Sequence, residues 1–248
     1  MPTAGWYRAR RMTTHRAFAP RHPGNEHWRH RVTRPRAVVV LASGGLDSCA
    51  LIGHSARKGR EVFPLFIKAG MTWEAAELHA LRRFLAGLPA ALGRRVRPLK
   101  VLSVSMGDLY GNHWSTTGRG VPGWRATDSS VYLPGRNIML LSMGGVYAAT
   151  IGVPAIAIGT LSANPFPDGA GQFFKRLGGA LSTGLGFPLT IEAPFRRLGK
   201  EVIMRRFADL PLERTFSCSN PRRLSPCGAC AKCRERILAE TTATSRRK

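Results

Sequence analysis

The sequence predicts an α/β protein built on a doubly wound parallel sheet. Short apolar runs rich in β-branched residues alternate with stretches of helical character along residues 37–209, an alternation that is typical of βαβ units. The first run, 37–42, contains no polar residue, as expected of a strand buried on both faces of a parallel sheet. Four cysteines near the C-terminus add a small four-Cys segment to this domain.

Periodicity and turn residues assign each element a range. The predicted strands are 37–42, 61–67, 99–104, 155–158 and about 189–191. The predicted helices are 49–56, 72–86, about 136–150, 171–182 and about 199–209. Residues 105–130, rich in Gly, Ser and Thr, are expected to form an irregular loop. The helix over 72–86 is expected to carry its apolar side on Ala75, Leu78, Leu81 and Leu85.

Composition divides the chain into three regions, 1–36, 37–215 and 216–248. The net charge is +24, and residues 1–36 hold nine arginines against one acidic residue. Such a tail is compatible with an arm that grips nucleic acid, an organelle transit peptide, a disordered extension or a start codon assigned too far upstream. A disordered extension is favoured over the arm because no folded nucleic-acid motif accompanies it. No apolar run reaches the roughly 18–20 residues that a membrane span needs.

A glycine-containing loop directly follows the first predicted strand. It reads Ser43-Gly44-Gly45-Leu46-Asp47-Ser48 and falls at the carboxyl end of the strand, where doubly wound sheets bind their ligands. Unpaired N–H groups and the helix dipole at this point favour phosphate, and the glycines allow close approach. The serine hydroxyls can bind phosphate oxygens. Asp47 repels phosphate unless a cation intervenes, which suggests Mg²⁺ coordination or an orienting role.

The cysteine cluster predicts a metal centre. Cys218, Cys227, Cys230 and Cys233 lie within 16 residues, and two-residue gaps let a tight turn offer two sulfurs to one ion. Zinc is the expected ion, with an iron–sulfur cluster as the rival. Four thiolates leave zinc no open position for water, so the ion would be structural. Free cysteines also favour the reducing cytoplasm, and Cys49 is expected to be an inert core residue.

The loop resembles the fingerprint of the ATP pyrophosphatase superfamily, and further motifs narrow the resemblance. The chain from about 37 to 240 resembles the 7-cyano-7-deazaguanine synthases of the queuosine pathway. Besides the loop, this resemblance is carried by the segments 133–137, 158–159, 193–194 with 200–203, and 215–218 with 227–236. It implies a Rossmann-like fold and a homodimer. It also implies an ATP-dependent ligase that converts 7-carboxy-7-deazaguanine and ammonia to the nitrile, releasing AMP and pyrophosphate.

The resemblance also implies roles for individual residues. Asp47, Ser48, Arg136 and Lys200 are the expected catalytic groups, because the two cations can stabilise phosphate or a developing oxyanion. Asn137 can bind a ribose or base edge, or cap the helix that follows Gly135. The expected ATP-binding residues are Leu41, Ala42, Ser43, Gly44, Gly45, Leu46, Asp47, Ser48, Gly135, Arg136 and Asn137.

Two segments depart from the family pattern on the substrate side. The family usually shows Tyr-Gly-Gln after the second strand, where this chain has Ala69-Gly70-Met71. After Gly159 the usual Asp-Tyr-Ser-Gly-Tyr-Pro-Asp-Cys-Arg-like string is replaced by residues 160–169. There Phe166 can stack on a planar base and Asp168 can accept from the exocyclic amine and ring N–H of a deazaguanine, or the two can serve loop packing and a turn cap.

Three functions therefore remain to be compared. The first is nitrile synthesis. The second applies the same adenylation to another acid, stops at an amide, or conjugates a deazaguanine to an amine. The third is a basic, zinc-containing module that binds nucleic acid, which the phosphate loop argues against.

Overall fold

The computed structural model describes residues 31–245 and shows a five-stranded sheet in which every pairing is parallel. The strand order is β3-β2-β1-β4-β5. The strands are β1 Ala37–Leu41, β2 Glu61–Lys68, β3 Lys100–Ser103, β4 Ala155–Ala157 and β5 Thr190–Glu192. The first strand lies at the centre, and the chain winds outward from it in both directions. This confirms the predicted doubly wound α/β fold.

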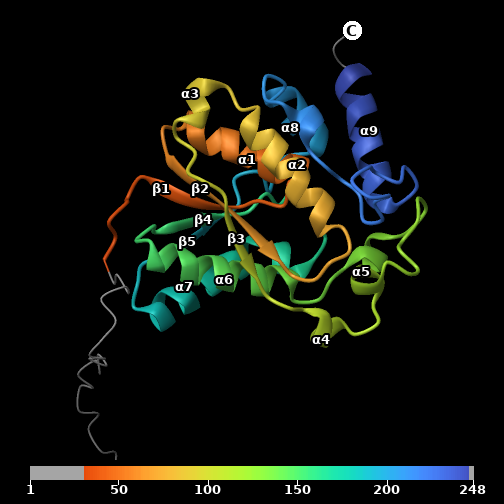
Figure 1. The fold of residues 1–248 in the computed structure, drawn as a ribbon. Coiled ribbons are helices and arrows are strands. Elements are labelled where there is room, and N and C mark those ends of the chain that lie inside the picture. The colour runs from red at the N-terminus through yellow and green to blue at the C-terminus, as the bar shows by residue number, and fades with distance from the viewer. Residues whose placement is uncertain (1–30, 246–248) are drawn as a thin grey trace, which may run out of the picture.

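Helices cover both faces of the sheet (Figure 1). The longer helices are α1 Leu46–Arg57, α2 Glu74–Ala86, α6 Arg136–Thr150, α7 Gly171–Leu185, α8 Lys200–Arg206 and α9 Ala231–Ser245. Single turns form α3 Ala90–Gly93, α4 Gly107–Tyr110 and α5 Trp114–Thr117, and three 3-10 turns form η1 Asp128–Val131, η2 Pro167–Gly169 and η3 Leu212–Arg214. No helix of the described part is long and apolar enough to cross a membrane.

The two sides of β1 face two separate cores, because successive side chains of a strand alternate between faces. Val38 and Val40 pack with α1, α2 and α8, whereas Val39 and Leu41 pack with α6 and α7. All five residues of β1 are buried, as the apolar run predicted. The strand is thereby fixed at the middle of the molecule, and the loop that follows it is held from both sides.

The predicted elements are found with changes at their ends. The helix after β1 begins at Leu46, not at residue 49, because the last residues of the loop form its first turn. The predicted side of the second helix was wrong for Ala75, which is exposed, whereas Ala76 and Ala80 are buried. The helix expected over 199–209 ends at Arg206. The loop expected over 105–130 contains the single turns α4 and α5.

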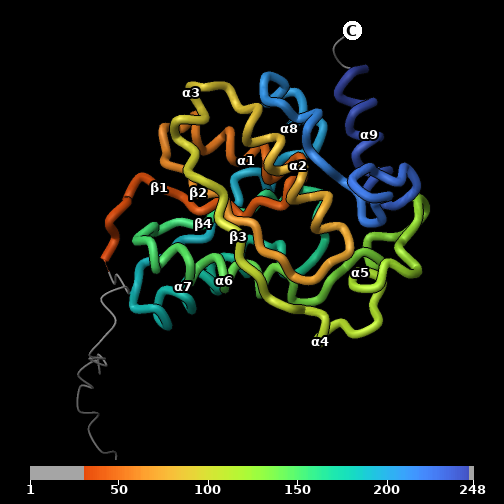
Figure 2. Tube along the Cα trace, in the orientation of Figure 1, coloured from red at the N-terminus to blue at the C-terminus, as the bar shows by residue number. Residues whose placement is uncertain are grey.

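The C-terminal segment lies beside the long connection between β3 and α6, far from it in sequence (Figure 2). An isolated bridge joins Gly123 to Cys230, and the N–H of Ala231 donates to the carbonyl of Pro122 at 3.1 Å. Arg234 reaches the carbonyl of Trp124. The predicted basic tail falls largely on residues 1–30, which lie outside the described residues.

Candidate functional site

The loop after β1 is closed by its own serines. The Ser48 hydroxyl accepts from the N–H of Ser43 at 3.1 Å and donates to the carbonyl of Gly45 at 3.0 Å. The Ser43 hydroxyl accepts from the N–H of Gly45 at 3.2 Å. These contacts hold the loop against the start of α1, where the first N–H groups of a helix have no partner within it. The arrangement can bind an anion such as pyrophosphate.

Two glycines allow other backbone segments to approach this loop. Gly44 has a φ of +76°, and a Cβ there would stand 2.1 Å from the carbonyl oxygen of Glu77 in α2. Gly159 follows β4, and a Cβ there would lie 3.0 Å from the backbone of Asp47. The loop is thus clamped between α2 and the exit of β4, and either position would resist a side chain.

A chain of charges leads from the loop to the C-terminal helix. Lys200, at the start of α8, lies 3.5 Å from Oδ2 of Asp47 and 2.5 Å from Oε1 of Glu235 in α9. Glu235 also pairs with Lys232 at 2.9 Å. Burial opposes the charge on Lys200, but Asp47 and Glu235 together raise its pKa. Lys200 therefore stays protonated beside the loop.

The loop, Arg136 and Lys200 face one cavity of about 300 Å³. Its wall includes ten of the predicted catalytic and ATP-binding residues: Leu41, Ala42, Ser43, Gly45, Leu46, Asp47, Ser48, Arg136, Asn137 and Lys200. Gly44 and Gly135 are not in the wall; each takes a positive φ and shapes the backbone beside it. Residues that are far apart in sequence are thereby brought into one site.

The two predicted substrate residues lie outside this wall. Asp168 is buried, and its carboxylate accepts from the backbone N–H of Asn137 at 3.2 Å, so it caps the start of α6. Phe166 stacks on Tyr132 with ring centroids 4.6 Å apart. The alternative that Asn137 caps this helix does not hold, because its side chain donates to the carbonyl of Asp168 instead. The substrate role of Phe166 and Asp168 stays a prediction.

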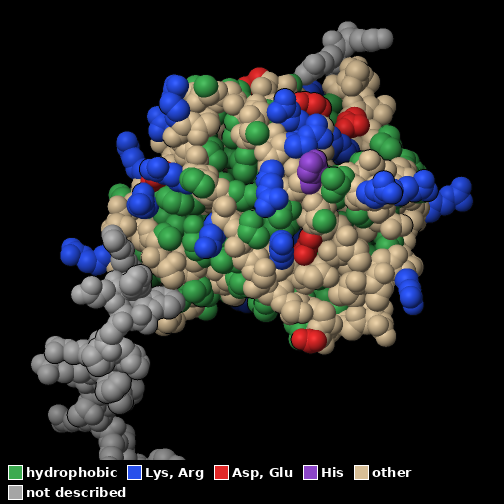
Figure 3. All heavy atoms as spheres, in the orientation of Figure 1, with side chains coloured by type: hydrophobic (Ala, Val, Ile, Leu, Met, Phe, Trp, Pro, Cys, Tyr) green, Lys and Arg blue, Asp and Glu red, His purple; other side chains and the backbone are tan. Residues whose placement is uncertain are grey.

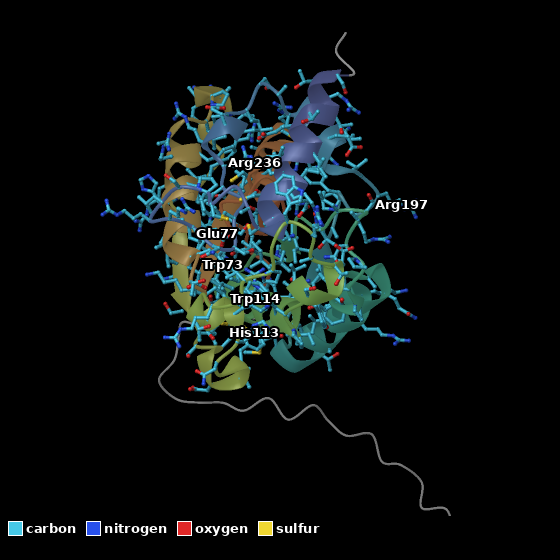
Figure 4. All side chains as sticks on the ribbon, turned by 90° about the vertical axis from the view of Figure 1, so that its right-hand side faces the viewer. Trp73, Glu77, His113, Trp114, Arg197 and Arg236 are labelled. Carbon is cyan, nitrogen blue, oxygen red and sulfur yellow. The ribbon has the colours of Figure 1, made fainter. Side chains whose placement is uncertain are left out.

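The residues of the cavity that the sequence did not predict include Trp73, Glu77 and Trp114. Trp73 precedes α2 and is 5% exposed, and its ring stacks on that of Trp114 from α5 at 5.5 Å. Burial raises the pKa of Glu77 to about 8, with Arg136 opposing. Figure 4 shows where Trp73, Glu77 and Trp114 lie among the side chains. The sequence does contain a signal that could have identified Glu77 as a site residue. Glu77 lies on a face of α2 whose other members, such as Leu81 and Phe84, are apolar.

The departure from the family pattern after β2 has a visible structural counterpart. Ala69 and Met71 are buried in a small cluster with Trp73, Met106 and Leu133. Neither Ala69 nor Met71 reaches the cavity, whereas Trp73 does. The aromatic ring at this end of the cavity therefore comes from Trp73, just before α2, and not from the segment that directly follows β2.

The four predicted cysteines converge as expected. The sulfurs of Cys218, Cys227, Cys230 and Cys233 all lie within 4.8 Å of one another. The contacts from Cys218 to Cys227 and to Cys230 measure 3.5 and 3.8 Å, and those from Cys233 to Cys230 and to Cys227 measure 3.6 and 3.9 Å. A tetrahedron with metal–sulfur bonds of 2.3 Å has edges of about 3.8 Å. The cluster can therefore hold a single metal ion.

Backbone donors surround these sulfurs. The N–H groups of Asn220 and Cys227 point to Sγ of Cys218 at 3.3 Å, and that of Ser219 points to Sγ of Cys230 at 3.4 Å. Such outer contacts stabilise thiolates and orient ligands. Cys49, by contrast, is fully buried in the core, and burial raises the pKa of its thiol, as expected of an inert residue.

Comparison with known proteins agrees with these features. The model of the family described as "Queuosine biosynthesis protein QueC" matches residues 36–243. A 7-cyano-7-deazaguanine synthase from Anaeromyxobacter dehalogenans is 34% identical over 213 residues, covering 80% of this chain and 88% of the relative. One from Caldicellulosiruptor bescii is 31% identical, covering 82% and 91%.

Solved structures give a more distant likeness. The predicted subunit of a tRNA methyltransferase from Methanocaldococcus jannaschii superimposes with a TM-score of 0.44 at 16% identity, covering 70% of this chain and 74% of that one. The assignment rests on the sequence matches instead, which span most of both chains. The protein belongs to the QueC family of queuosine biosynthesis proteins.

Proposed function

We propose that this enzyme converts 7-carboxy-7-deazaguanine and ammonia into 7-cyano-7-deazaguanine, cleaving ATP to AMP and pyrophosphate. One observation carries the proposal beyond family membership. The Ser43–Ser48 loop, Arg136 and Lys200 face a single cavity at the carboxyl ends of β1 and β4. At the carboxyl ends of these strands, an anion-binding loop and two cationic side chains suit a reaction between a nucleoside triphosphate and a carboxylate.

The reaction proceeds through two adenylations. A carboxylate oxygen attacks the α-phosphorus of ATP and pyrophosphate leaves; ammonia then displaces AMP and gives the amide. The amide oxygen attacks a second ATP in the same way, and elimination of AMP with loss of the two amide protons leaves the nitrile. Each AMP thus carries away one oxygen of the original carboxylate. Adenylation is needed because neither carboxylate oxygen nor amide oxygen is a good leaving group by itself.

Side chains of the cavity divide this work. The backbone of the loop binds the departing pyrophosphate, and Lys200 stabilises the charge that grows on the phosphates. Arg136 lies at the start of α6, with an Nε that is buried and has no hydrogen-bond partner among residues 31–245. Its planar guanidinium suits the substrate carboxylate and the oxyanion that forms from it.

The residues also fit two metal ions. Oδ1 of Asp47 is buried and has no hydrogen-bond partner in the described part of the chain, and a single carboxylate beside phosphates is a common Mg²⁺ arrangement. When bound, Mg²⁺ would neutralise phosphate charge. Zinc suits the four cysteines, because their spacing matches one tetrahedral ion; each cysteine of a four-iron cluster binds a different iron, which would hold the sulfurs further apart. Zinc would be structural here.

Three further expectations belong to this proposal. Free ammonia is the nitrogen source, as the resemblance to the family implies. The enzyme is a homodimer, by resemblance to its family. It works in the cytoplasm, where the thiols of the cluster remain reduced and able to bind metal.

The test is incubation with ATP, Mg²⁺, ammonia and 7-carboxy-7-deazaguanine, followed by mass spectrometry. The proposal predicts 7-cyano-7-deazaguanine together with AMP and pyrophosphate. If pyrophosphate is released but the product is an amide, or if only a different planar acid is consumed, the enzyme would have one of the related ligase activities instead. No substrate-dependent pyrophosphate with any such acid, together with tight salt-dependent binding of RNA or DNA, would favour the nucleic-acid-binding module.

A further inference from the structure

An acidic and a basic side chain face the same cavity without pairing with each other. Glu77 on α2 and Arg136 at the start of α6 both line it. Among residues 31–245 no hydrogen bond or ion pair joins either side chain to another protein group, and Nε of Arg136 is buried. Leaving such groups unpaired costs free energy. A ligand that carries an acceptor for Arg136 and donors for Glu77 would recover that cost.

The same end of the cavity has a flat apolar wall. Trp73 is 5% exposed, and the partly buried Trp114 stacks on it with an interplanar angle of 26°. Both rings line the cavity with Leu133. A wide aromatic surface next to hydrogen-bonding side chains is suited to one face of a planar heterocycle.

We propose, on the basis of the function proposed above, that Glu77 reads the edge of the deazaguanine that carries the ring N–H and the exocyclic amine. The tryptophan wall packs on the flat face of the base. A guanine-like edge presents two adjacent N–H donors. Their hydrogen bonds would favour the ionised form of Glu77 and lower its raised pKa on binding, so that its carboxylate offers two acceptors at a matching spacing. The carboxyl group at position 7 lies across the ring from this edge, so it can meet Arg136 when the edge meets Glu77.

ATP is a poorer occupant for this position. The corresponding edge of adenine places an acceptor, N1, beside its amine, so N1 would face an acceptor of the ionised carboxylate that suits the deazaguanine. Glu77 therefore separates the two substrates: the acid binds against α2 and α5, and the nucleotide binds against the Ser43–Ser48 loop.

Glu77→Gln tests this assignment, because the amide keeps the shape and replaces one acceptor with a donor that faces the exocyclic amine. Its kcat/KM for 7-carboxy-7-deazaguanine should fall by about 10–100-fold. The value for 7-carboxy-7-deazahypoxanthine, which lacks the amine, should change much less, and the KM for ATP should stay the same. The ratio of kcat/KM for 7-carboxy-7-deazaguanine to that for 7-carboxy-7-deazahypoxanthine should therefore fall in the variant. A melting curve shows whether the variant is folded.

Two further variants complete the set. Glu213→Gln makes the same chemical change on an exposed side chain and should alter none of these values. Trp114→Ala should raise the KM for either acid without changing that for ATP, whereas Trp114→Phe should restore most of the affinity.

Isothermal titration with each acid separates failure of this assignment from failure of the proposed function. If the wild type binds 7-carboxy-7-deazaguanine without turnover, and Glu77→Gln weakens this binding, the assignment of Glu77 is supported and the proposed reaction is refuted. Turnover with an unchanged preference in Glu77→Gln would remove the assignment alone. Absence of both binding and turnover in the wild type would overturn both.

Discussion

Asp47 joins the phosphate loop to the cations around it. One carboxylate oxygen lies 3.5 Å from Nζ of Lys200, and the other is buried with no hydrogen-bond partner among residues 31–245. Burial raises the pKa of Asp47, and Lys200 opposes this effect. An unsatisfied buried carboxylate oxygen destabilises the fold, so its retention favours a role in binding a cation.

Asp47→Asn should therefore separate catalysis from stability. We expect pyrophosphate release to fall by about 100-fold or more, because the amide cannot provide the charge for Mg²⁺. The melting temperature should stay the same or rise, since a buried charge is removed. A pyrophosphate-release assay and a melting curve provide the two measurements. Turnover near that of the wild type would refute the role of Asp47.

Glu77 makes the free energy of unfolding depend on pH. Burial raises its pKa from 4.5 to about 8, so the folded state holds a proton that the unfolded state releases between these values. The resulting stabilisation is fully present below pH 4.5 and is lost as the pH rises through 8.

Glu77→Gln should remove this dependence. Between pH 5 and pH 9 the free energy of unfolding of the variant should rise relative to that of the wild type by about 2–5 kcal/mol. Denaturant titrations of both proteins at each pH measure the difference, in which other titrating groups cancel. A difference that does not change with pH would show that Glu77 titrates normally.

The C-terminal segment lines the cavity and also carries the four-cysteine cluster. Cys218 and Lys232 line the cavity, and the N–H of Phe216 donates to the carbonyl of Gly44 in the loop at 2.9 Å. Arg236 of α9 donates to the carbonyls of Thr215 and Leu212, which anchors the helix to the segment before the first cysteine. An ion held by the cysteines would therefore stabilise the wall that carries Lys232.

Cys230→Ser should lose the metal and, with it, activity. We expect one zinc per chain in the wild type, less in the variant, and a melting temperature lower by about 5 °C or more. Elemental analysis and calorimetry measure both effects. Cys49→Ala is the matched control, since it also removes a buried thiol but should keep the metal. Iron in place of zinc would contradict the proposed ion.

Sequence reasoning succeeded where the evidence was local. The run from Ala37 to Ala42 predicted the central strand, and the spacing of the cysteines predicted their cluster. It failed where a site is assembled from distant segments. Trp114 lies in a turn within a predicted irregular loop. Glu77 shares a face of α2 with apolar residues, but only the folded chain brings it to the same cavity as Arg136 of α6. The partner that Asp168 caps could not be read from the sequence, because the contact with the start of α6 spans 31 residues.

At the scale of the whole molecule, positive charge is the dominant feature. The net charge is +24, and Lys and Arg side chains are spread over the face in Figure 3 with few acidic ones between them. Such a field attracts ATP and a carboxylate substrate alike, an effect that salt weakens. The same field attracts any polyanion, so charge alone does not distinguish an enzyme from a nucleic-acid-binding protein.

The central claim is that the substrate oxygens are removed as AMP, and isotope transfer tests it most directly. The enzyme would be given 7-carboxy-7-deazaguanine with both carboxylate oxygens as ¹⁸O, together with ATP, Mg²⁺ and ammonia. Mass spectrometry of the nucleotides should find one ¹⁸O in each AMP, two such AMP molecules for every nitrile formed, and none in pyrophosphate. Label in inorganic phosphate with ADP as the nucleotide product, or AMP without label, would contradict the account.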